Sequence, residues 1–153
     1  MKVIVDSREQ TPFPFTGYDV EVVRAGLPSG DYSLPGFEDR VAVERKSLAD
    51  LVACLMGDNR ERFERELVRL ARYDLAAVVI EAGWCDLAAG NYRSDMKPHS
   101  ACQSVLAFQV RYRVPFIWAG SRKAAEYVTH SILAKYLREI EIRVAVARKG
   151  QAA

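Results

Sequence analysis

The sequence predicts an α/β fold of three layers, in which helices cover both faces of a central mixed sheet. Short β-branched runs come mostly first, and amphipathic helical patterns then alternate with further apolar runs. A length of 153 residues corresponds to one domain rather than two. The composition, 50% hydrophobic and 27% charged, is that of an ordinary globular domain. It excludes a disordered tail protein, a collagen-like fibre and a disulfide-stapled miniprotein.

The first part of the chain supplies short extended segments that turn residues separate. Four β-branched or apolar runs are strand candidates, namely residues 2–6, 20–23, 31–34 and 41–45. Residues 10–17 contain two prolines and a glycine, so we expect a loop there. Glycine and proline also predict turns at residues 26–30 and 35–39.

Helical patterns begin at Ser47. Ser47 and Asp50 fit the S-x-x-[DE] capping pattern of a helix start, and residues 57–59 are expected to break this first helix. A second helix is predicted over residues 60–72, where apolar residues recur at helical spacing.

The last part of the chain alternates strands and helices. We predict a nearly all-apolar strand at residues 76–81 and a polar loop at residues 90–98. A third helix follows at residues 99–112 and a last strand at residues 115–118. Ser121 can cap a fourth helix that carries its own apolar stripe. Residues 143–153 are basic and rich in Ala, Gly and Gln, so we expect a frayed, flexible tail there.

No part of the chain reads as a membrane segment. The longest apolar runs, such as Leu75–Ile80, fall far short of the ~18 residues that span a bilayer. Asp6 comes too early for the apolar core of a signal peptide. We therefore expect no membrane contact and a protein that stays where it is made, in the cytoplasm or, in a eukaryote, the nucleus.

Neither the cysteines nor the net charge identifies a ligand. The three cysteines include no CxxC pair, which favours free thiols over a zinc site. The net charge of +2 is too balanced to indicate nucleic acid by itself. Arginines nevertheless crowd residues 60–72, and a solvated helix face is the simpler explanation of that charge.

An unusual polar pattern ends the strand predicted at residues 41–45. Because side chains alternate along a strand, Glu44 and Lys46 share one face while Val43 and Arg45 point to the other. One interpretation is a surface ion pair, worth only ~0–1 kcal/mol. The other is a metal-dependent phosphodiesterase site.

The second interpretation has a definite chemical basis. Hydrolysis of a phosphodiester needs a cation that neutralises charge and lowers the pKa of the attacking water. Mg²⁺ prefers oxygen ligands, usually one or two carboxylates, and Asp31 and Glu44 supply these if their strands are neighbours. Lys46 could orient or deprotonate the water, or stabilise the charged transition state.

The surrounding residues make the pattern far more specific. In chain order they are Val5-Asp6-Ser7-Arg8-Glu9, Gly30-Asp31-Tyr32, Glu44-Arg45-Lys46-Ser47 and Asp50. Together they resemble the XPF/Hef-type nuclease domain, whose signature is G-D, a short gap and E-R-K-x-x-x-D. That family is a branch of the PD-(D/E)XK restriction-endonuclease-like fold. The resemblance extends over roughly residues 2–138, and it implies a nuclease domain at residues 1–142.

The resemblance implies a role for each matching residue. Asp31 and Glu44 would bind the metal, Lys46 would serve the water or the phosphate, and Arg45 would steady the site or contact the DNA backbone. Asp6 and Glu9 would line the same pocket, with either one ligating metal through water.

For the other polar residues, a role at the site and a purely structural role both fit the sequence. Asp50 fits a catalytic position as well as its capping role beside Ser47. Arg8 would line the pocket, and Arg62 and Arg65 could contact DNA phosphates. Glu61 lies four residues before Arg65 and Glu66 three residues before Arg69, so pairing on the helix surface is the competing interpretation. Arg8 could likewise form a plain surface pair with Glu9. Tyr92, Arg93, Lys97 and His99 could touch the substrate or simply form an exposed loop.

The resemblance implies a Mg²⁺- or Mn²⁺-dependent endodeoxyribonuclease that cuts branched DNA, such as a flap, fork or junction, in repair, recombination or replication. The alternatives are a non-catalytic DNA-binding or scaffold subunit and a purely structural assembly protein. Family members commonly carry a tandem helix-hairpin-helix module, and no segment here resembles one. We therefore expect tight DNA binding to need a homodimer through the third and fourth helices, or a helicase or DNA-binding partner.

Overall fold

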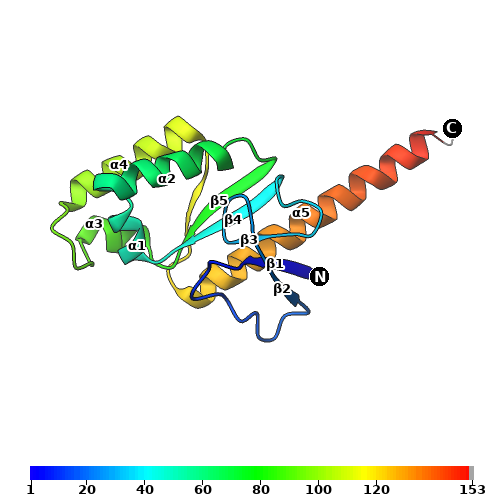
Figure 1. The fold of residues 1–153 in the computed structure, drawn as a ribbon, viewed down its shortest axis with the longest axis horizontal. Coiled ribbons are helices and arrows are strands. Elements are labelled where there is room, and N and C mark those ends of the chain that lie inside the picture. Colours follow the sequence, from blue (N-terminus) through cyan, green and yellow to red (C-terminus); the bar gives the residue numbers. More distant parts are fainter. Residues whose placement is uncertain (152–153) are drawn as a thin grey trace.

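A computed structural model describes residues 1–151 of the chain, and its centre is a six-stranded mixed sheet (Figure 1). The strands lie in the order β2-β1-β3-β4-β5-β6. They are β1 (Lys2–Asp6), β2 (Glu21–Ala25), β3 (Tyr32–Ser33), β4 (Val41–Lys46), β5 (Leu75–Ile80) and β6 (Phe116–Trp118). Strand β3 runs antiparallel to both β1 and β4, while the other neighbours are parallel. All six strand candidates of the sequence are therefore found, within a few residues of their predicted bounds.

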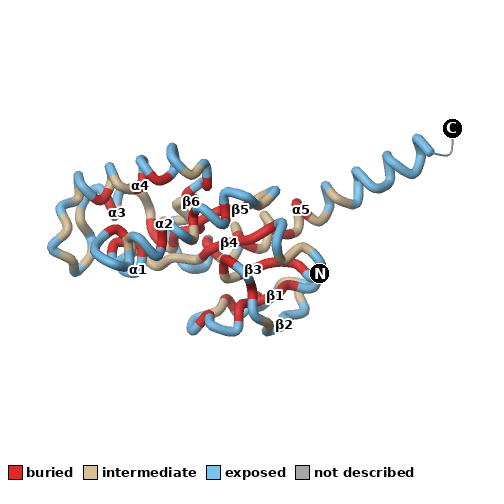
Figure 2. Tube along the Cα trace, turned by 45° about the horizontal axis from the view of Figure 1, so that its top comes forward, coloured by how far each residue is buried: buried red, intermediate tan, exposed pale blue. Residues whose placement is uncertain are grey.

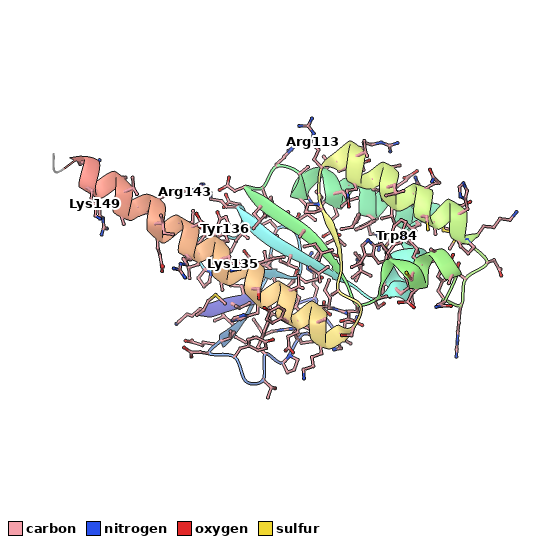
Figure 3. The ribbon with its side chains drawn as sticks, turned by 180° about the vertical axis from the view of Figure 1, so that it is seen from behind. Trp84, Arg113, Lys135, Tyr136, Arg143 and Lys149 are labelled. Carbon is pink, nitrogen blue, oxygen red and sulfur yellow. The ribbon has the colours of Figure 1, made fainter. Side chains whose placement is uncertain are left out.

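Five helices pack on the sheet in the described part of the chain. They are α1 (Leu48–Ala53), α2 (Gly57–Leu70), α3 (Trp84–Ala89), α4 (Pro98–Tyr112) and α5 (Arg122–Gln151). Helices α1 to α4 lie on one face and α5 crosses the other, as the view from behind shows (Figure 3). The predicted three-layer architecture with a central mixed sheet is confirmed. No helix among residues 1–151 is both long and apolar enough to cross a bilayer.

Alternation along β4 and β5 gives each face of the sheet its own core. Ala42 and Val78 face α1 to α4, where they pack with Phe63 and Phe108. Val43 and Val79 face α5 and pack with its apolar residues. These strands are buried on both faces, as their nearly continuous apolar sequences indicate. The burial view confirms that the strands form the buried centre of the protein (Figure 2).

The helix boundaries differ from the predicted ones in two places. Helix α2 begins at Gly57 instead of residue 60, because the chain breaks earlier, at the extended residue Met56. Helix α3 was not predicted, since six residues are too few to show a helical period. Asp86 begins it by accepting a hydrogen bond from the Gly83 amide at 2.9 Å.

The C-terminal segment also differs from the prediction. We expected fraying after Ile142, but α5 continues to Gln151 as an exposed helix that projects beyond the sheet (Figures 1 and 2). Residues 143–148 are mostly arginine, alanine and valine, and alanine and arginine favour a helix even without packing. The prediction gave too much weight to the glycine at position 150. Residues 152–153 lie outside the described residues.

Gly30 forms the turn that leads into β3. Its φ of +79° lies in the left-handed region, and a Cβ there would come 2.9 Å from the Cβ of Ala42. The next residue, Asp31, ties two strands together through its backbone. Its amide donates to Val43 at 2.9 Å, and its carbonyl accepts from the Asp6 amide at 2.8 Å. The turn therefore sets where Asp31 lies relative to β1 and β4.

We predict that Gly30→Ala lowers the free energy of unfolding by about 2 kcal/mol or more, because the left-handed conformation and the close contact with Ala42 both oppose a side chain. Gly36→Ala is the matched control. Gly36 has a φ of +82° but nothing within 4 Å of its would-be Cβ, so only the conformational cost of about 1 kcal/mol applies. Urea unfolding measures both. Equal losses in the two variants would contradict the close packing at Gly30.

Candidate active site

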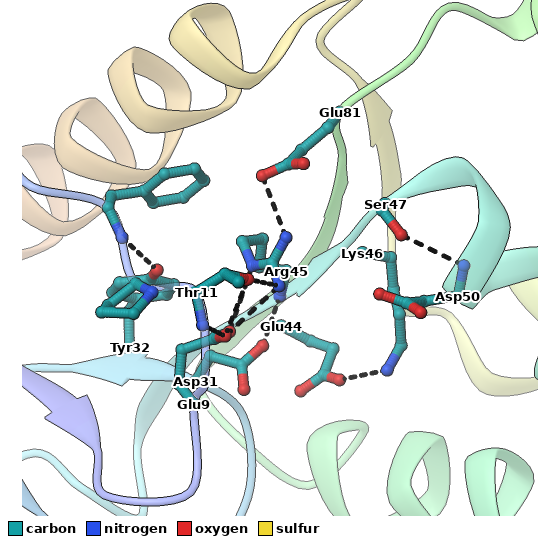
Figure 4. A network of polar contacts seen from close by, with 12 residues as sticks. Glu9, Thr11, Asp31, Tyr32, Glu44, Arg45, Lys46, Ser47, Asp50 and Glu81 are labelled. Carbon is teal, nitrogen blue, oxygen red and sulfur yellow. Dashed lines mark hydrogen bonds and ion pairs between the residues drawn. The ribbon is translucent and has the colours of Figure 1, made fainter.

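Three strands bring the predicted site residues to one edge of the sheet. Asp6 ends β1, and Glu44 and Lys46 lie at the end of β4. Because β3 is antiparallel to both strands, Asp31 at its start lies at the same edge. Figure 4 shows Asp31, Glu44 and Lys46 gathered there.

Glu44 and Lys46 lie on the face of β4 that packs against α2, as the alternation predicted. The Lys46 Nζ lies 2.7 Å from the Glu44 Oε1 and 5.3 Å from the centre of the Phe63 ring. Burial would lower the pKa of Lys46, but the charge and hydrogen bond of Glu44, together with the charges of Cys54 and Glu66, outweigh burial and hold that pKa above its ordinary value. Lys46 is therefore an ammonium donor at neutral pH.

Asp31 and Glu44 form a crowded pair of carboxylates. Burial raises the pKa of Asp31 to about 7, and the charges of Glu9 and Glu66 add to the rise, although the Arg45 amide opposes it. That amide donates to Asp31 Oδ2 at 2.7 Å. Burial and then the charge of Asp31 raise the pKa of Glu44 well above its usual range. Burial therefore makes ionisation of both carboxylates harder, and the charge of Asp31 adds to this at Glu44. A bound cation relieves this situation.

Arg45 points to the opposite face of β4 and holds the loop after β1 against the sheet. Its guanidinium donates to Glu9, to Thr11 and to Glu81, at 2.6 to 3.2 Å. Its side chain is only 9% exposed and that of Glu9 only 5%. Arg122 of α5 also donates to Glu81, at 2.7 Å. Every donor group of the Arg45 guanidinium has a partner within the protein, and this supports a steadying role over contact with DNA.

Asp6 and Arg8 form their own pair beside the carboxylates. Both oxygens of Asp6 accept hydrogen bonds from the Arg8 guanidinium, and Arg8 also donates to the Leu27 carbonyl. Burial would raise the pKa of Asp6, but the Arg8 hydrogen bonds outweigh burial and lower that pKa. The Asp6 carboxylate is therefore ionised and paired with the Arg8 guanidinium. Its role as a metal ligand stays a prediction.

Two hollows flank the carboxylate pair, and both are lined by Arg8, Asp31 and Glu44. The first, of about 290 Å³, is also lined by Lys46 and Asp50. Ser47 caps α1, because its Oγ accepts a hydrogen bond from the Asp50 amide at 3.1 Å. This bond involves only the backbone of Asp50, and the role of the Asp50 carboxylate stays a prediction. The prediction that Ser47 starts a helix is confirmed.

The second hollow, of about 260 Å³, is lined by Arg62, Glu66 and Arg69 of α2. Arg65 lines neither hollow and lies 3.8 Å from Glu61 on the helix surface. The structure therefore brings Arg62, but not Arg65, to the site.

Sequence reasoning did not place Glu66 and Arg69 at the site. The Gly30 amide donates to Glu66 at 3.4 Å, and Arg69 donates to the Ser29 hydroxyl at 2.9 Å. A signal was present, since residues 62, 66 and 69 are spaced i, i+4 and i+7 and so share one helix face. Glu81 and Arg122 carried no such signal, because the pairing of β4 with β5 brings Glu81 to Arg45 and the packing of α5 brings Arg122 to Glu81.

The donor set suits a hard divalent cation that keeps waters and phosphate in its shell. Within residues 1–151, no three His, Cys, Asp or Glu side chains converge as a complete protein cage. Asp31 and Glu44 are two carboxylates, the number that Mg²⁺ sites usually take from a protein. The raised pKa values of both carboxylates agree with a site that needs positive charge.

Comparison with known proteins identifies the family. The ERCC4 domain family matches residues 5–132. The chain belongs to the ERCC4 domain family. This match covers the whole site, from Asp6 to Arg69, and confirms the resemblance to the XPF/Hef-type nuclease domain. No curated protein matches the chain.

Solved structures show the same ERCC4 fold. XPF from Aeropyrum pernix is similar with a TM-score of 0.71 and 26% identity, over 89% of this chain and 61% of that one. A structure of XPF from Aeropyrum pernix in complex with DNA gives a TM-score of 0.70 and 25% identity, over 90% of this chain and 66% of that one. This chain thus spans somewhat less than two thirds of the archaeal chains.

We predict that Asp31→Asn stabilises the metal-free ERCC4 domain near pH 8 by about 1–2 kcal/mol, or roughly 4 °C in the unfolding temperature. The pKa of Asp31 is about 7 in the folded protein, above its ordinary value of 3.8. Between these two pH values the unfolded chain therefore binds fewer protons than the folded protein does. Stability of the parent protein therefore falls as pH rises through this range. Asparagine keeps an acceptor for the Arg45 amide.

Thermal unfolding in EDTA from about pH 4 to pH 8 measures this difference. The gain in stability of Asp31→Asn over the parent protein should be absent near pH 4 and complete near pH 8. A gain that is independent of pH, or a loss of stability, would contradict the raised pKa of Asp31.

Proposed function

We propose that the chain is a Mg²⁺- or Mn²⁺-dependent endodeoxyribonuclease that hydrolyses phosphodiester bonds in branched DNA. The observation that carries this proposal is the pair formed by the half-buried Asp31 and the buried Glu44 beside the Lys46 ammonium, in a hollow open to solvent. Family membership supports a nuclease, and the archaeal relative whose structure includes DNA supports a DNA substrate.

Asp31 and Glu44 would hold the cation, which supplies charge neutralisation and a lowered pKa for the attacking water. Lys46 remains protonated, so its role is to donate to the scissile phosphate or to the charge that develops on it, rather than to remove a proton. Arg45 and Glu9 keep β4 and the loop after β1 in place, so that Asp31 and Glu44 stay side by side.

The second hollow would seat the neighbouring DNA phosphates. Arg62 and Arg69 lie on its α2 side and Arg8, which is paired with Asp6, on its β1 side. Glu66 also lines this hollow, so Arg62 and Arg69 are the arginines there that could meet a phosphate. Arginines that meet phosphates fix the register of the strand without reading its sequence. Net charge alone did not indicate nucleic acid, but this local arrangement does.

The finer parts of the function are also proposals. We infer a branched substrate, such as a flap, fork or junction, and a role in repair, recombination or replication. A homodimer through α4 and α5 would supply a larger DNA-binding surface. Leu106 and Val110 of α4 and Tyr127 of α5 are exposed apolar side chains that support such contact, with Val110 80% exposed. A helicase or DNA-binding partner is the other source of affinity.

A non-catalytic DNA-binding subunit is the second candidate function. It would need the same basic hollow but not the buried carboxylate pair. Burial raises the pKa of both Asp31 and Glu44, and the charge of Asp31 adds to the rise at Glu44, so the ionised pair destabilises the metal-free fold. The intact pair therefore favours the enzyme.

We predict that Glu44→Gln lowers metal-dependent cleavage of a labelled fork by about 100-fold or more, since it removes a charge that the cation needs. Asp39→Asn, at an exposed turn, is the matched control and should cut at the parent rate. Gel assays with Mg²⁺, with Mn²⁺ and with EDTA measure the rate. Full activity in Glu44→Gln, or unchanged cutting in EDTA, would refute the metal-dependent mechanism.

We predict that Arg62→Ala weakens DNA binding across all sequences and lowers the slope of log affinity against log salt by about one, as the loss of one phosphate contact does. Arg65→Ala, three residues along the same helix, should leave that slope unchanged. Fluorescence anisotropy over a range of salt concentrations measures both. The same loss in the two variants would mean that α2 contributes only general positive charge.

A further inference from the structure

A third hollow, of about 460 Å³, is lined by α1, which also contributes Asp50 to the hollow beside the carboxylate pair. Its walls are α1 with Met56, and the loop of residues 92–95 that joins α3 to α4, which runs beside α1 in Figures 1 and 2. The volume falls within the range of about 300–1,000 Å³ that is usual for small-ligand sites. The proposed DNA cleavage does not use this hollow.

The lining of this hollow is largely apolar and contains one aromatic ring. Ala49, Val52 and Ala53 form the α1 wall, and the Met56 thioether lies at the edge, 39% exposed. Tyr92 forms part of the opposite wall. Its hydroxyl donates to the Met96 carbonyl at 2.8 Å and its ring packs against the main core, so the ring is held in place.

The charges around the hollow balance each other. Arg93 and Asp95 are the only charged residues in its lining within the described chain. A phosphate would therefore find no pair of arginines like Arg62 and Arg69 in the hollow beside α2. A flat and uncharged heterocycle suits these walls, because every nucleobase has a face that stacks on an aromatic ring. Arg93 is exposed and can attract the backbone of the same strand.

The position of the hollow relates it to the cleavage site. Helix α1 has six residues, and Asp50 lines the carboxylate hollow while Ala49 and Ala53 line this one. A helix with its side chains is about 10–12 Å across. A strand that places a phosphate at Asp31 and Glu44 can therefore reach the hollow within a few nucleotides. A paired base leaves its duplex only at the cost of lost stacking and pairing, whereas an unpaired base enters freely.

We propose that the hollow between α1 and residues 92–95 binds one unpaired nucleobase of the DNA strand that is cut, with Tyr92 as its stacking partner. The inference rests on the proposed function and extends it, since it names the feature of branched DNA that the site selects. A cut near a junction leaves an unpaired nucleotide within reach, and a continuous duplex does not.

The test scans a forked DNA whose single-stranded arm carries one abasic nucleotide, moved one position at a time. Anisotropy in EDTA measures binding without cleavage. The parent protein should lose about ten-fold in affinity at one position, the effect of one lost stacking contact. Ala53→Leu fills the hollow from an exposed helical position and should abolish this discrimination. Ala145→Leu, on the exposed end of α5, is the matched control and should behave as the parent.

Discrimination that is absent at every position, or that survives in Ala53→Leu, overturns the inference. A change of oligomeric state in Ala53→Leu, with no effect on the abasic scan, also overturns it and assigns the hollow to a second copy of the chain. Cleavage of the fork without abasic discrimination would leave the proposed nuclease standing. A position-specific abasic effect without metal-dependent cleavage would support this site and count against the nuclease.

Discussion

The structure depends on two carboxylates, the half-buried Asp31 and the buried Glu44, side by side at the edge of the sheet. Burial raises the pKa of both groups, and the charge of Asp31 adds to the rise at Glu44. The fold holds them there through the backbone of Asp31, which is bonded to both β1 and β4, and through the packed strand that carries Glu44. An arrangement that is unfavourable in the metal-free protein is a common mark of a functional site.

The residues around the pair divide into a supporting side and a binding side. On the α5 face of the sheet, Arg45 is enclosed by carboxylate and hydroxyl partners and fastens the loop after β1. On the α2 face, Lys46 and Arg62 remain open to the hollows, where charge can meet a substrate. The alternation of a single strand thus separates the groups that hold the site from the groups that would act on DNA.

Much of this could be predicted from the sequence, because strand alternation and a specific motif decide it. The faces of Glu44 and Lys46 follow from the period of a strand, and the motif indicated the family. Other features depend on tertiary contacts that no local pattern records. Helix α3 is too short to show a period, and Glu81 meets Arg45 because β5 pairs with β4. Glu66 was visible in the helical spacing but was interpreted as a surface partner.

A calorimetric titration of Mn²⁺ into the metal-free protein near neutral pH, without DNA, would test whether Asp31 and Glu44 form a cation site. We expect one saturable binding event that releases protons, because the pKa of Asp31, about 7, leaves part of the pair protonated before the metal binds. The event should disappear in Glu44→Gln. Binding that is unchanged in that variant, or no saturable binding in the parent protein, would contradict the assignment of Asp31 and Glu44 as the cation site.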